Sequence, residues 1–196
     1  MAERELTATQ WRAYGGASFP EHAWSIDGTV LRAIAGLERV DLITRDAFAD
    51  FTLLFDWRLP RGGSSQVLCR VDEAAGPAEQ SGPALQLLDD EHHTEGADAL
   101  TSCGALYALM APWREQRSAA NAYHSGRIVM RGSALEYWLD DHQVIGCDLA
   151  SEELKVRISR SRLRDFPRFA QLPAGHIVLK HRGTEAWFRR LRIATA

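Results

Sequence analysis

Long apolar runs are missing from this chain of 196 residues, and so is an excess of charge of one sign. No segment approaches the roughly 20 apolar residues that a transmembrane helix needs, and residues 1–5 lack the apolar core of a signal peptide. The net charge is −3 with both signs mixed along the sequence, and the one basic cluster, in residues 157–168, is interpreted as a solvated helix face. We therefore expect no nucleic-acid or membrane partner. The expected location is the cytoplasm, or an exported compartment if a signal has been removed.

Cysteine is scarce, which excludes a disulfide framework. The three cysteines, Cys69, Cys103 and Cys147, lie far apart and among apolar neighbours. Their odd number fits reduced thiols, and no spacing of the kind found in metal sites links them. We expect them to be small core residues.

Strand patterns fill most of the chain. Between residues 51 and 59, five apolar side chains (Phe51, Leu53, Phe55, Trp57 and Leu59) occupy alternate positions, which predicts a strand with one buried face. Residues 64–71 and 83–88 are predicted strands, residues 104–107 are predicted to begin another, and hairpins are expected at Asp27-Gly28 and at Gly132-Ser133.

Sequence patterns typical of a helix are rare in this chain. Only residues 151–163 are expected to be helical, with Ser151 as the N-cap and two acids in the first turn. Many short strands and one short helix predict an all-β, two-sheet antiparallel sandwich. We expect one domain over residues 19–196, preceded by a loose N-terminal arm over residues 1–18.

Short motifs occur along the chain in a fixed order. Residues 175–183 read Gly-His-Ile-Val-Leu-Lys-His-Arg-Gly, and residues 187–193 read Trp-Phe-Arg-Arg-Leu-Arg-Ile. The earlier motifs are Trp24-x-x-Asp27-Gly28-x-x-Leu31, Asp50-Phe51-x-Leu53, Gly62-Gly63-Ser64-Ser65-Gln66, Gly82-Pro83-Ala84-Leu85-Gln86-Leu87-Leu88-Asp89-Asp90, Gly104-Ala105-Leu106-Tyr107 and Trp138-Leu139-Asp140-Asp141. In order and spacing, the set resembles the 3-keto-disaccharide hydrolase family over roughly residues 19–196.

The resemblance implies a fold and a reaction. The family has a concanavalin A-like, jelly-roll sandwich, and it cleaves glycosides whose C3 hydroxyl has been oxidised to a ketone. The ketone acidifies the C2 proton, so the reaction needs a base near C2, electrophilic stabilisation near the C3 oxygen, and an acid for the leaving group. A small sugar or glycoside is therefore the expected partner, a divalent metal is a possible cofactor, and the oligomeric state stays open.

The polar positions depart from the family pattern. The family's glutamate two residues before Gln86 is Ala84 here, and its Gln-Asp-His in the last hairpin is Lys180-His181-Arg182. The resemblance and the new polar residues together predict the candidate site. We expect catalytic roles for His124, His181 and Asp89, substrate binding by Arg70, Gln86, Lys180, Arg182 and Arg189, and a metal ligand in His93, with Arg70, Gln86 and His124 facing one concave groove.

Two functions remain open at this point, and a third, a lectin-like structural module with no role in sugar binding, has little specific support in the sequence. The first is a glycoside-cleaving enzyme that acts on 3-keto-glycosides, with a histidine as base and weak dependence on metal. The alternative is a non-catalytic carbohydrate-binding module or partner subunit of the same fold, which the loss of the family's carboxylates would explain. Four tryptophans (Trp57, Trp113, Trp138 and Trp187) are candidates for a sugar platform, although core packing is expected for most of them.

Overall fold

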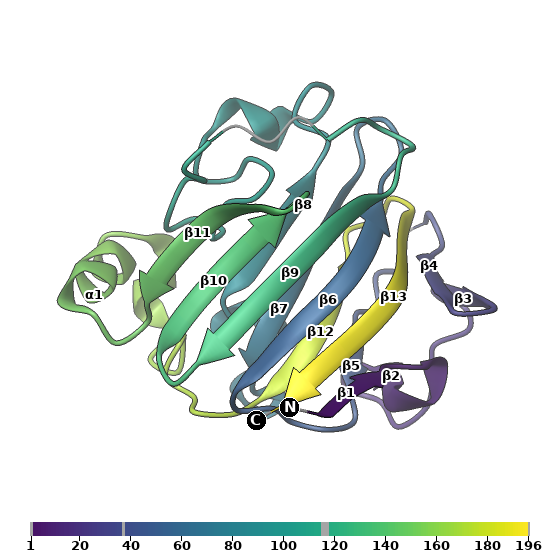
Figure 1. Ribbon diagram of the computed structural model, residues 1–196, viewed down its shortest axis with the longest axis horizontal. Helices are drawn as coiled ribbons and strands as arrows, with labels where there is room; N and C mark the ends of the chain where they lie inside the picture. The colour runs from purple at the N-terminus through teal and green to yellow at the C-terminus, as the bar shows by residue number, and fades with distance from the viewer. Residues whose placement is uncertain (1, 37, 115–117, 196) are drawn as a thin grey trace.

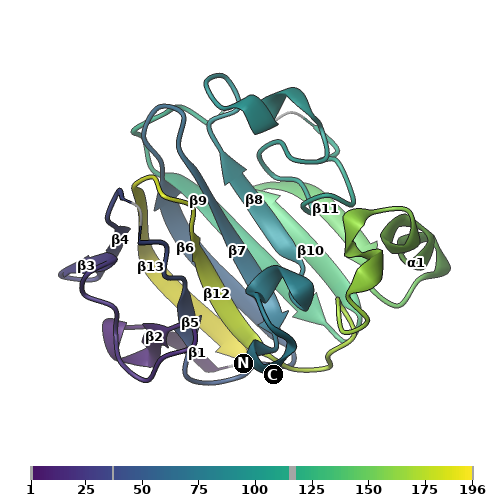
Figure 2. The ribbon, with the colours of Figure 1, turned by 180° about the vertical axis from the view of Figure 1, so that it is seen from behind.

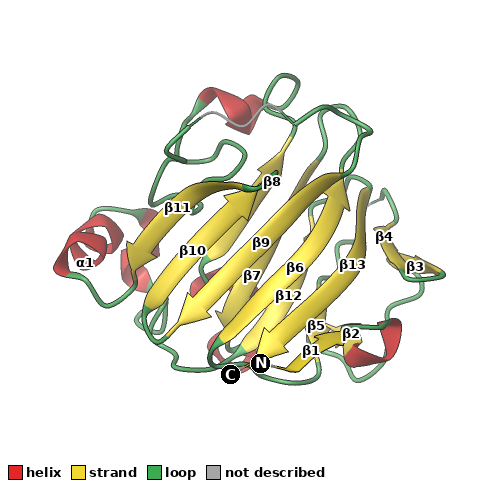
Figure 3. Ribbon diagram, viewed as in Figure 1, coloured by secondary structure: helices red, strands yellow, loops and turns green. Residues whose placement is uncertain are grey.

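The computed structural model describes residues 2–36, 38–114 and 118–195, which form two antiparallel sheets packed face to face (Figure 1, Figure 3). The concanavalin A-like β-sandwich with one short helix is therefore confirmed. The larger sheet has the order β11-β10-β9-β6-β13-β4-β3, with β1 also paired to β13, and the smaller sheet has the order β2-β5-β12-β7-β8. None of the helices in these residues has the length and hydropathy of a membrane-spanning helix.

The strands are short, and their bounds agree with the alternating patterns where those are strongest. They are β1 (Ala2–Glu5), β2 (Trp11–Ala13), β3 (Trp24–Asp27), β4 (Val30–Ala33), β5 (Leu42–Thr44), β6 (Phe51–Arg58), β7 (Ser64–Val71), β8 (Ala84–Leu88), β9 (His124–Arg131), β10 (Ala134–Leu139), β11 (His142–Asp148), β12 (His176–His181) and β13 (Ala186–Thr195). Both expected hairpins form, as β3–β4 and β9–β10.

The core lies between the sheets and is centred on β6. Phe51, Phe55 and Trp57 are 0%, 2% and 1% exposed, as the alternation predicts. Across from them, the inner face of the smaller sheet contributes Val67 and Cys69. Burial raises the pKa of the Cys69 thiol to about 12, so this cysteine is an inert core residue, as expected.

The first residues are not a loose arm. β1 pairs with β13 in the larger sheet, and β2 pairs with β5 in the smaller one. Trp11 is fully buried. The short apolar segments in this region carry too few residues to show an alternating pattern, so the sequence alone indicated no strand. Met1 and Ala196, the outer bounds of the two predicted parts, lie outside the described residues.

The helix is shorter than predicted, and one predicted strand is replaced by a bridge. Helix α1 spans Glu152–Ser159, and the Ser151 hydroxyl accepts a hydrogen bond from the Leu154 N–H as its cap. A separate 3₁₀ turn, Arg162–Asp165, follows it. Residues 104–107 form no strand, but Leu106 makes isolated bridges to Leu85 on the edge of β8 and to Met110.

Two long loops flank β8 and determine the shape of the smaller sheet's outer face, which is turned to the viewer in Figure 2. The loop before β8 contains the 3₁₀ turns Glu73–Ala75 and Ala78–Gln80, and Ala78 packs on the outer side of Leu68 and Val178. The loop after β8 contains the turn Thr94–Ala97. These loops supply polar side chains that the strands themselves lack.

Candidate functional site

A polar row crosses the outer face of the smaller sheet. Gln66 on β7 is paired in register with Gln86 on β8 and with Lys180 on β12, and side chains paired in this way share a face. The Gln66 Nε2 donates to Gln86 Oε1 at 2.8 Å. Gln86 itself is fully buried. Its role is therefore to orient the side chain of Gln66, to which it is hydrogen-bonded, from beneath the surface.

The next row on the same face is apolar. Ala84, Leu68, Val178 and Ile43 form one cluster together with Ala78 from the loop before β8. This cluster holds the loop on the sheet, and the loop in turn places Glu79 beside Lys180. Ala84, at the position where the resemblance implies a glutamate, is therefore part of an apolar contact. The carboxylate near Lys180 comes instead from a loop residue, Glu79.

Lys180 is held between two carboxylates. Its Nζ lies 2.7 Å from Glu79 Oε2 and 3.2 Å from Asp41 Oδ2. Burial alone lowers the pKa of Lys180, but Asp41 and Glu79 outweigh it and the net shift is upward. Burial also raises the pKa of Glu79, and the hydrogen bond and charge of Lys180 reverse this to a net lowering. The site therefore keeps a permanent ammonium group near neutral pH.

A second ion pair lies beside the first. The Arg182 guanidinium contacts Glu95 Oε2 at 2.8 Å, and the Tyr107 hydroxyl donates to Glu95 Oε1 at 2.7 Å. Gln86 Nε2 also donates to Glu95. Burial raises the pKa of Glu95, but the Tyr107 hydrogen bond and the Arg182 charge bring the net shift below its usual range. Glu95 thus connects the buried amide row to the surface cation.

A cavity of about 400 Å³ on the outer face of the sheet is lined by residues from both ion pairs and by their neighbours: Asp41, Gln66, Glu79, Tyr107, Lys180, His181 and Arg182. Arg39 and Arg162 complete its lining, and Arg162 lies 4.8 Å above the Tyr107 ring. Four cations line the cavity: Arg39, Arg162, Lys180 and Arg182. Asp41, Glu79 and the neighbouring Glu95 partly neutralise them, which leaves an excess of positive charge for an oxyanion.

Arg70 does not reach this cavity, so the predicted grouping with Gln86 is wrong. A bulge in the β7–β12 pairing interrupts the alternation, and Arg70 has a left-handed backbone with φ of 50°. Its guanidinium hydrogen-bonds the carbonyls of Ala49 and Leu172 and lies 3.4 Å from Asp50. Arg70 therefore joins loops at one end of the sandwich.

Of the two candidate histidine bases, His124 lies away from the cavity, whereas His181 is among the residues that line it but has both ring nitrogens engaged. His124 belongs to β9 of the larger sheet, where Nδ1 contacts Asp140 Oδ2 at 2.8 Å and the ring stacks on Trp57. His181 is 2% exposed, and its Nε2 contacts the Ile34 carbonyl while Nδ1 accepts from the Gly183 N–H. Strand alternation explains this placement, because Lys180 and Arg182 face outward and the residue between them faces the core.

The remaining predicted residues have structural contacts outside the cavity. Asp89 is buried and accepts from the Gly62 N–H, which holds the turn before β7. His93 caps the 3₁₀ turn after it by accepting from the Glu95 N–H. Arg189 lies on the larger sheet, 2.9 Å from Asp56 and stacked on Tyr123.

The donors present do not fit a divalent metal. Within the described residues, no group of three or more His, Cys, Asp or Glu side chains gathers in a way that would hold one. The two carboxylates nearest each other in the cavity, Asp41 and Glu79, are already bridged by the Lys180 ammonium.

Sequence reasoning placed Lys180, Arg182 and Gln86 together, and it missed the residues around them, most of which lie outside the strands. The list of missed residues is Arg39, Asp41, Gln66, Glu79, Glu95, Tyr107 and Arg162. Gln66 carried a usable signal, since it alternates with the core residue Val67 on a predicted strand, and Tyr107 did so as the last residue of the Gly104-Ala105-Leu106-Tyr107 motif. The positions of the other missed residues depend on how the loops fold onto the sheet. A local sequence pattern does not predict such long-range contacts.

Residues 5–194 match the model of the 3-keto-alpha-glucoside-1,2-lyase-like domain. The chain belongs to this family. A curated relative, the 3-keto-disaccharide hydrolase of Bacteroides thetaiotaomicron, is 22% identical over 217 residues, covering 95% of this chain and 74% of the relative. Membership places the chain in a glycoside hydrolase-like family and agrees with the resemblance seen in the motifs.

Solved structures share the fold. A candidate glycosyl hydrolase from Parabacteroides distasonis has a TM-score of 0.87 at 21% identity, covering 97% of this chain and 90% of that one. A carbohydrate-binding module from Bacillus subtilis has a TM-score of 0.60 at 13% identity, covering 97% and 100%. At these identities the likeness establishes the sandwich, and the function has to be argued from the cavity.

Proposed function

We propose that this family member cleaves 3-keto-glycosides in the cavity on the smaller sheet, by elimination across C1–C2 followed by hydration. The observation that carries the proposal is the pair of outward-facing cations, Lys180 and Arg182, next to the carboxylate of Glu79. The reaction forms an enediolate whose negative charge grows on the C3 oxygen, and preorganised cations stabilise such a charge.

The cavity size suits this class of substrate. Ligand sites in proteins usually measure about 300–1,000 Å³, and the cavity of about 400 Å³ falls inside that range. The buried amides of Gln66 and Gln86 form a fixed polar floor, because each is bonded to the other or to Glu95. A sugar with several hydroxyl groups finds both donors and acceptors there.

Glu79 is the best base in the cavity. Both oxygens of Asp41 are engaged, one by the His181 N–H and one by Lys180, and both oxygens of Glu95 are engaged as well. Glu79 is held by Lys180 and by its own backbone, and its side chain is 46% exposed. A partly open carboxylate beside a permanent cation can accept a proton from an acidified C–H group.

The steps then follow from these positions. Glu79 takes the C2 proton, the C–H electrons form the C2–C3 enediolate, and Lys180 and Arg182 stabilise the oxyanion at C3. The enediolate then reforms the ketone and expels the C1 oxygen of the aglycone, which gains a proton. Tyr107 carries the only hydroxyl among the described lining residues and is the proposed donor. Water finally adds across the C1–C2 double bond, with OH at C1 and H at C2.

The test uses a chromogenic 3-keto-glucoside and the purified protein. Glu79→Gln should lower kcat roughly 10²–10⁴-fold, the usual contribution of a general base, and Lys180→Met should lower it roughly 10²–10³-fold. His124→Gln is the matched control and should retain wild-type turnover, because His124 lies on the other sheet. Turnover that survives Glu79→Gln but is lost in His124→Gln would contradict the proposal.

A non-catalytic carbohydrate-binding function is the second candidate. It is favoured by one observation: Lys180, Arg182, Asp41 and Glu95 are all paired internally, so these four charges already compensate one another before a substrate arrives. Calorimetric binding of a 3-keto-glucoside without aglycone release, with the same affinity in Glu79→Gln, would favour this function over catalysis.

A further inference from the structure

The outer face of the larger sheet carries a row of side chains that the cavity chemistry does not use. The pairing register aligns one residue from each of five adjacent strands: Gln143 on β11, Trp138 on β10, Arg127 on β9, Leu54 on β6 and Arg192 on β13. Residues paired across strands share a face. At about 4.8 Å per strand, the row is roughly 19 Å long. We call it the cross-strand row.

A second tryptophan extends the row beyond β11. The Trp113 N–H donates to the Val144 carbonyl at the sheet edge, and the side chain is 59% exposed. Gly146 lies beneath it, and a Cβ on Gly146 would come within 2.9 Å of the Trp113 ring and 2.7 Å of the Gln143 amide. Glycine at this position therefore lets the indole lie against the strand while most of it stays open to solvent.

Arg127 is the polar centre of the row. Its guanidinium lies 4.0 Å from the centre of the Trp138 ring, and its buried Nε has no hydrogen-bond partner within residues 2–36, 38–114 and 118–195. Its neighbour Arg189 differs, because it is bonded to Asp56. An orphaned donor of this kind is costly unless a ligand satisfies the group.

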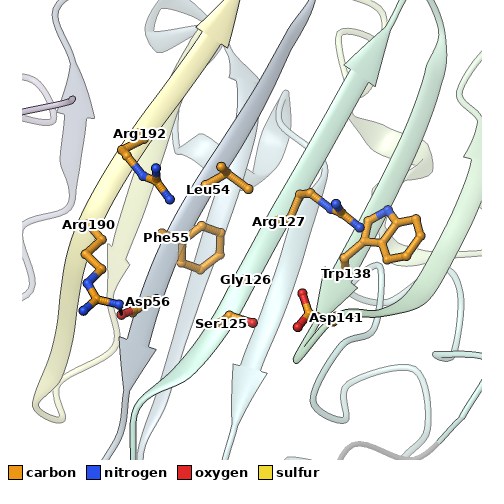
Figure 4. Close-up of a pocket in the computed structure, with 10 residues that line it drawn as sticks. All are labelled: Leu54, Phe55, Asp56, Ser125, Gly126, Arg127, Trp138, Asp141, Arg190 and Arg192. Carbon is orange, nitrogen blue, oxygen red and sulfur yellow. Dashed lines mark ion pairs between the residues drawn. The ribbon is translucent and has the colours of Figure 1, made fainter. Parts of the chain in front are cut away.

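A hollow of about 190 Å³ opens beside Arg127. Figure 4 shows Arg127 and Trp138 side by side, Ser125 and Asp141 near them, and Arg190 and Arg192 across Leu54. Charges there are nearly balanced, since Arg190 lies 3.5 Å from Asp56 and Arg192 contacts Glu3. The hollow thus offers donors and acceptors without the net positive field that a polyanion needs.

From this arrangement we propose that the cross-strand row and Trp113 bind a neutral glycan chain lying across the strands. The exposed indole of Trp113 and the partly buried indole of Trp138 match the apolar CH faces of pyranose rings, and the mixed polar groups around Arg127 match sugar hydroxyls. The row lies on the opposite sheet from the cavity, so glycan binding does not require the cavity to be catalytic. On the whole molecule, it would hold a polymer or a long oligosaccharide on one face while the other face acts on a chain end.

Affinity gel electrophoresis in soluble neutral polysaccharides tests this site directly. The probes are a β-1,3-glucan, a substituted β-1,4-glucan, a xylan and a mannan. Wild type should be retarded by at least one of them, and Trp113→Ala and Trp138→Ala should each weaken the apparent affinity roughly tenfold, the factor that corresponds to the loss of one stacked ring. Arg127→Leu should weaken it as well. Lys180→Met should be retarded like wild type, because it alters only the other face.

The outcomes separate the proposal from its competitors. No retardation in any of the four neutral polysaccharides overturns it, and so does retardation that persists in Trp113→Ala. Retardation only by polygalacturonate or single-stranded DNA, fading as salt rises, would reassign the row to a polyanion. If Trp138→Ala melts at a much lower temperature, the exposed Trp113→Ala variant and the Trp138→Tyr variant keep the test decisive. Turnover of the small 3-keto-glucoside should be the same in Trp113→Ala and wild type.

Discussion

Individual residues of this protein show that a motif position alone does not predict where a side chain lies. Gln86, Lys180 and Arg182 occupy matched or altered motif positions and gather at the cavity. Arg70 also matches a motif, yet the bulge on β7 turns it toward Ala49 and Leu172. Strand alternation predicts the face on which a side chain lies only while the strand pairing stays regular. An extra residue in one strand shifts the side chains that follow it to the opposite face.

The structural role of Arg70 gives a prediction that separates it from a substrate-binding residue. Arg70→Met should lower the free energy of unfolding by about 2 kcal/mol or more, because buried carbonyls lose their donors. The KM for a 3-keto-glucoside should stay unchanged in the folded fraction. Urea titration measures the stability, and steady-state kinetics measure the KM. A raised KM with unchanged stability would indicate that Arg70 binds the substrate.

Glu95 predicts a pH dependence of stability. Its pKa in the folded protein is lowered, against burial, by Tyr107 and Arg182, so its stabilising contribution is complete above the unfolded value of about 4.3 and is lost as the pH falls through the folded value. Glu95→Gln should therefore be less stable than wild type at pH 7, and the difference should shrink toward pH 3. The exposed Glu152→Gln variant is the control, and parallel stability curves for wild type and Glu95→Gln would contradict this role.

At the scale of elements, the strands were predictable and the loops were not. The stripe of β6, the β9–β10 hairpin and the Ser151 cap each follow from local residue patterns. The residues that complete the cavity come from loops, and their positions depend on non-local contacts such as Ala78 on Leu68. For the same reason Glu79 and Glu95 gave no signal in the sequence, since both lie in the loops that flank β8.

β6 is the element whose loss should damage the sandwich most. Phe55 is 2% exposed and packs against Phe188 of β13 with ring centroids 6.3 Å apart. Phe55→Ala should cost roughly 3–5 kcal/mol of stability, the usual range for deleting a buried aromatic ring. Chemical denaturation would measure it, and a loss below about 1 kcal/mol would show that β6 does not hold the core.

At the scale of the whole molecule, the sandwich separates two different surfaces. The smaller sheet carries the cation-rich cavity, and the larger sheet carries the charge-balanced row around Arg127. The fold alone supports enzymes and binding modules alike, as its structural neighbours illustrate. What favours catalysis here is the position of one partly open carboxylate beside a permanent ammonium group.

The most direct test of the central claim follows the C2 hydrogen of a 3-keto-glucoside during cleavage in D₂O, by NMR at early times. Elimination and hydration place one deuterium at C2 of the released 3-keto sugar, and both deuterium incorporation and aglycone release should be lost together in Glu79→Gln and fall together in Lys180→Met. Direct substitution at C1 would release the aglycone and leave hydrogen at C2. Aglycone release without deuterium at C2, or at the wild-type rate in Lys180→Met, would contradict the account.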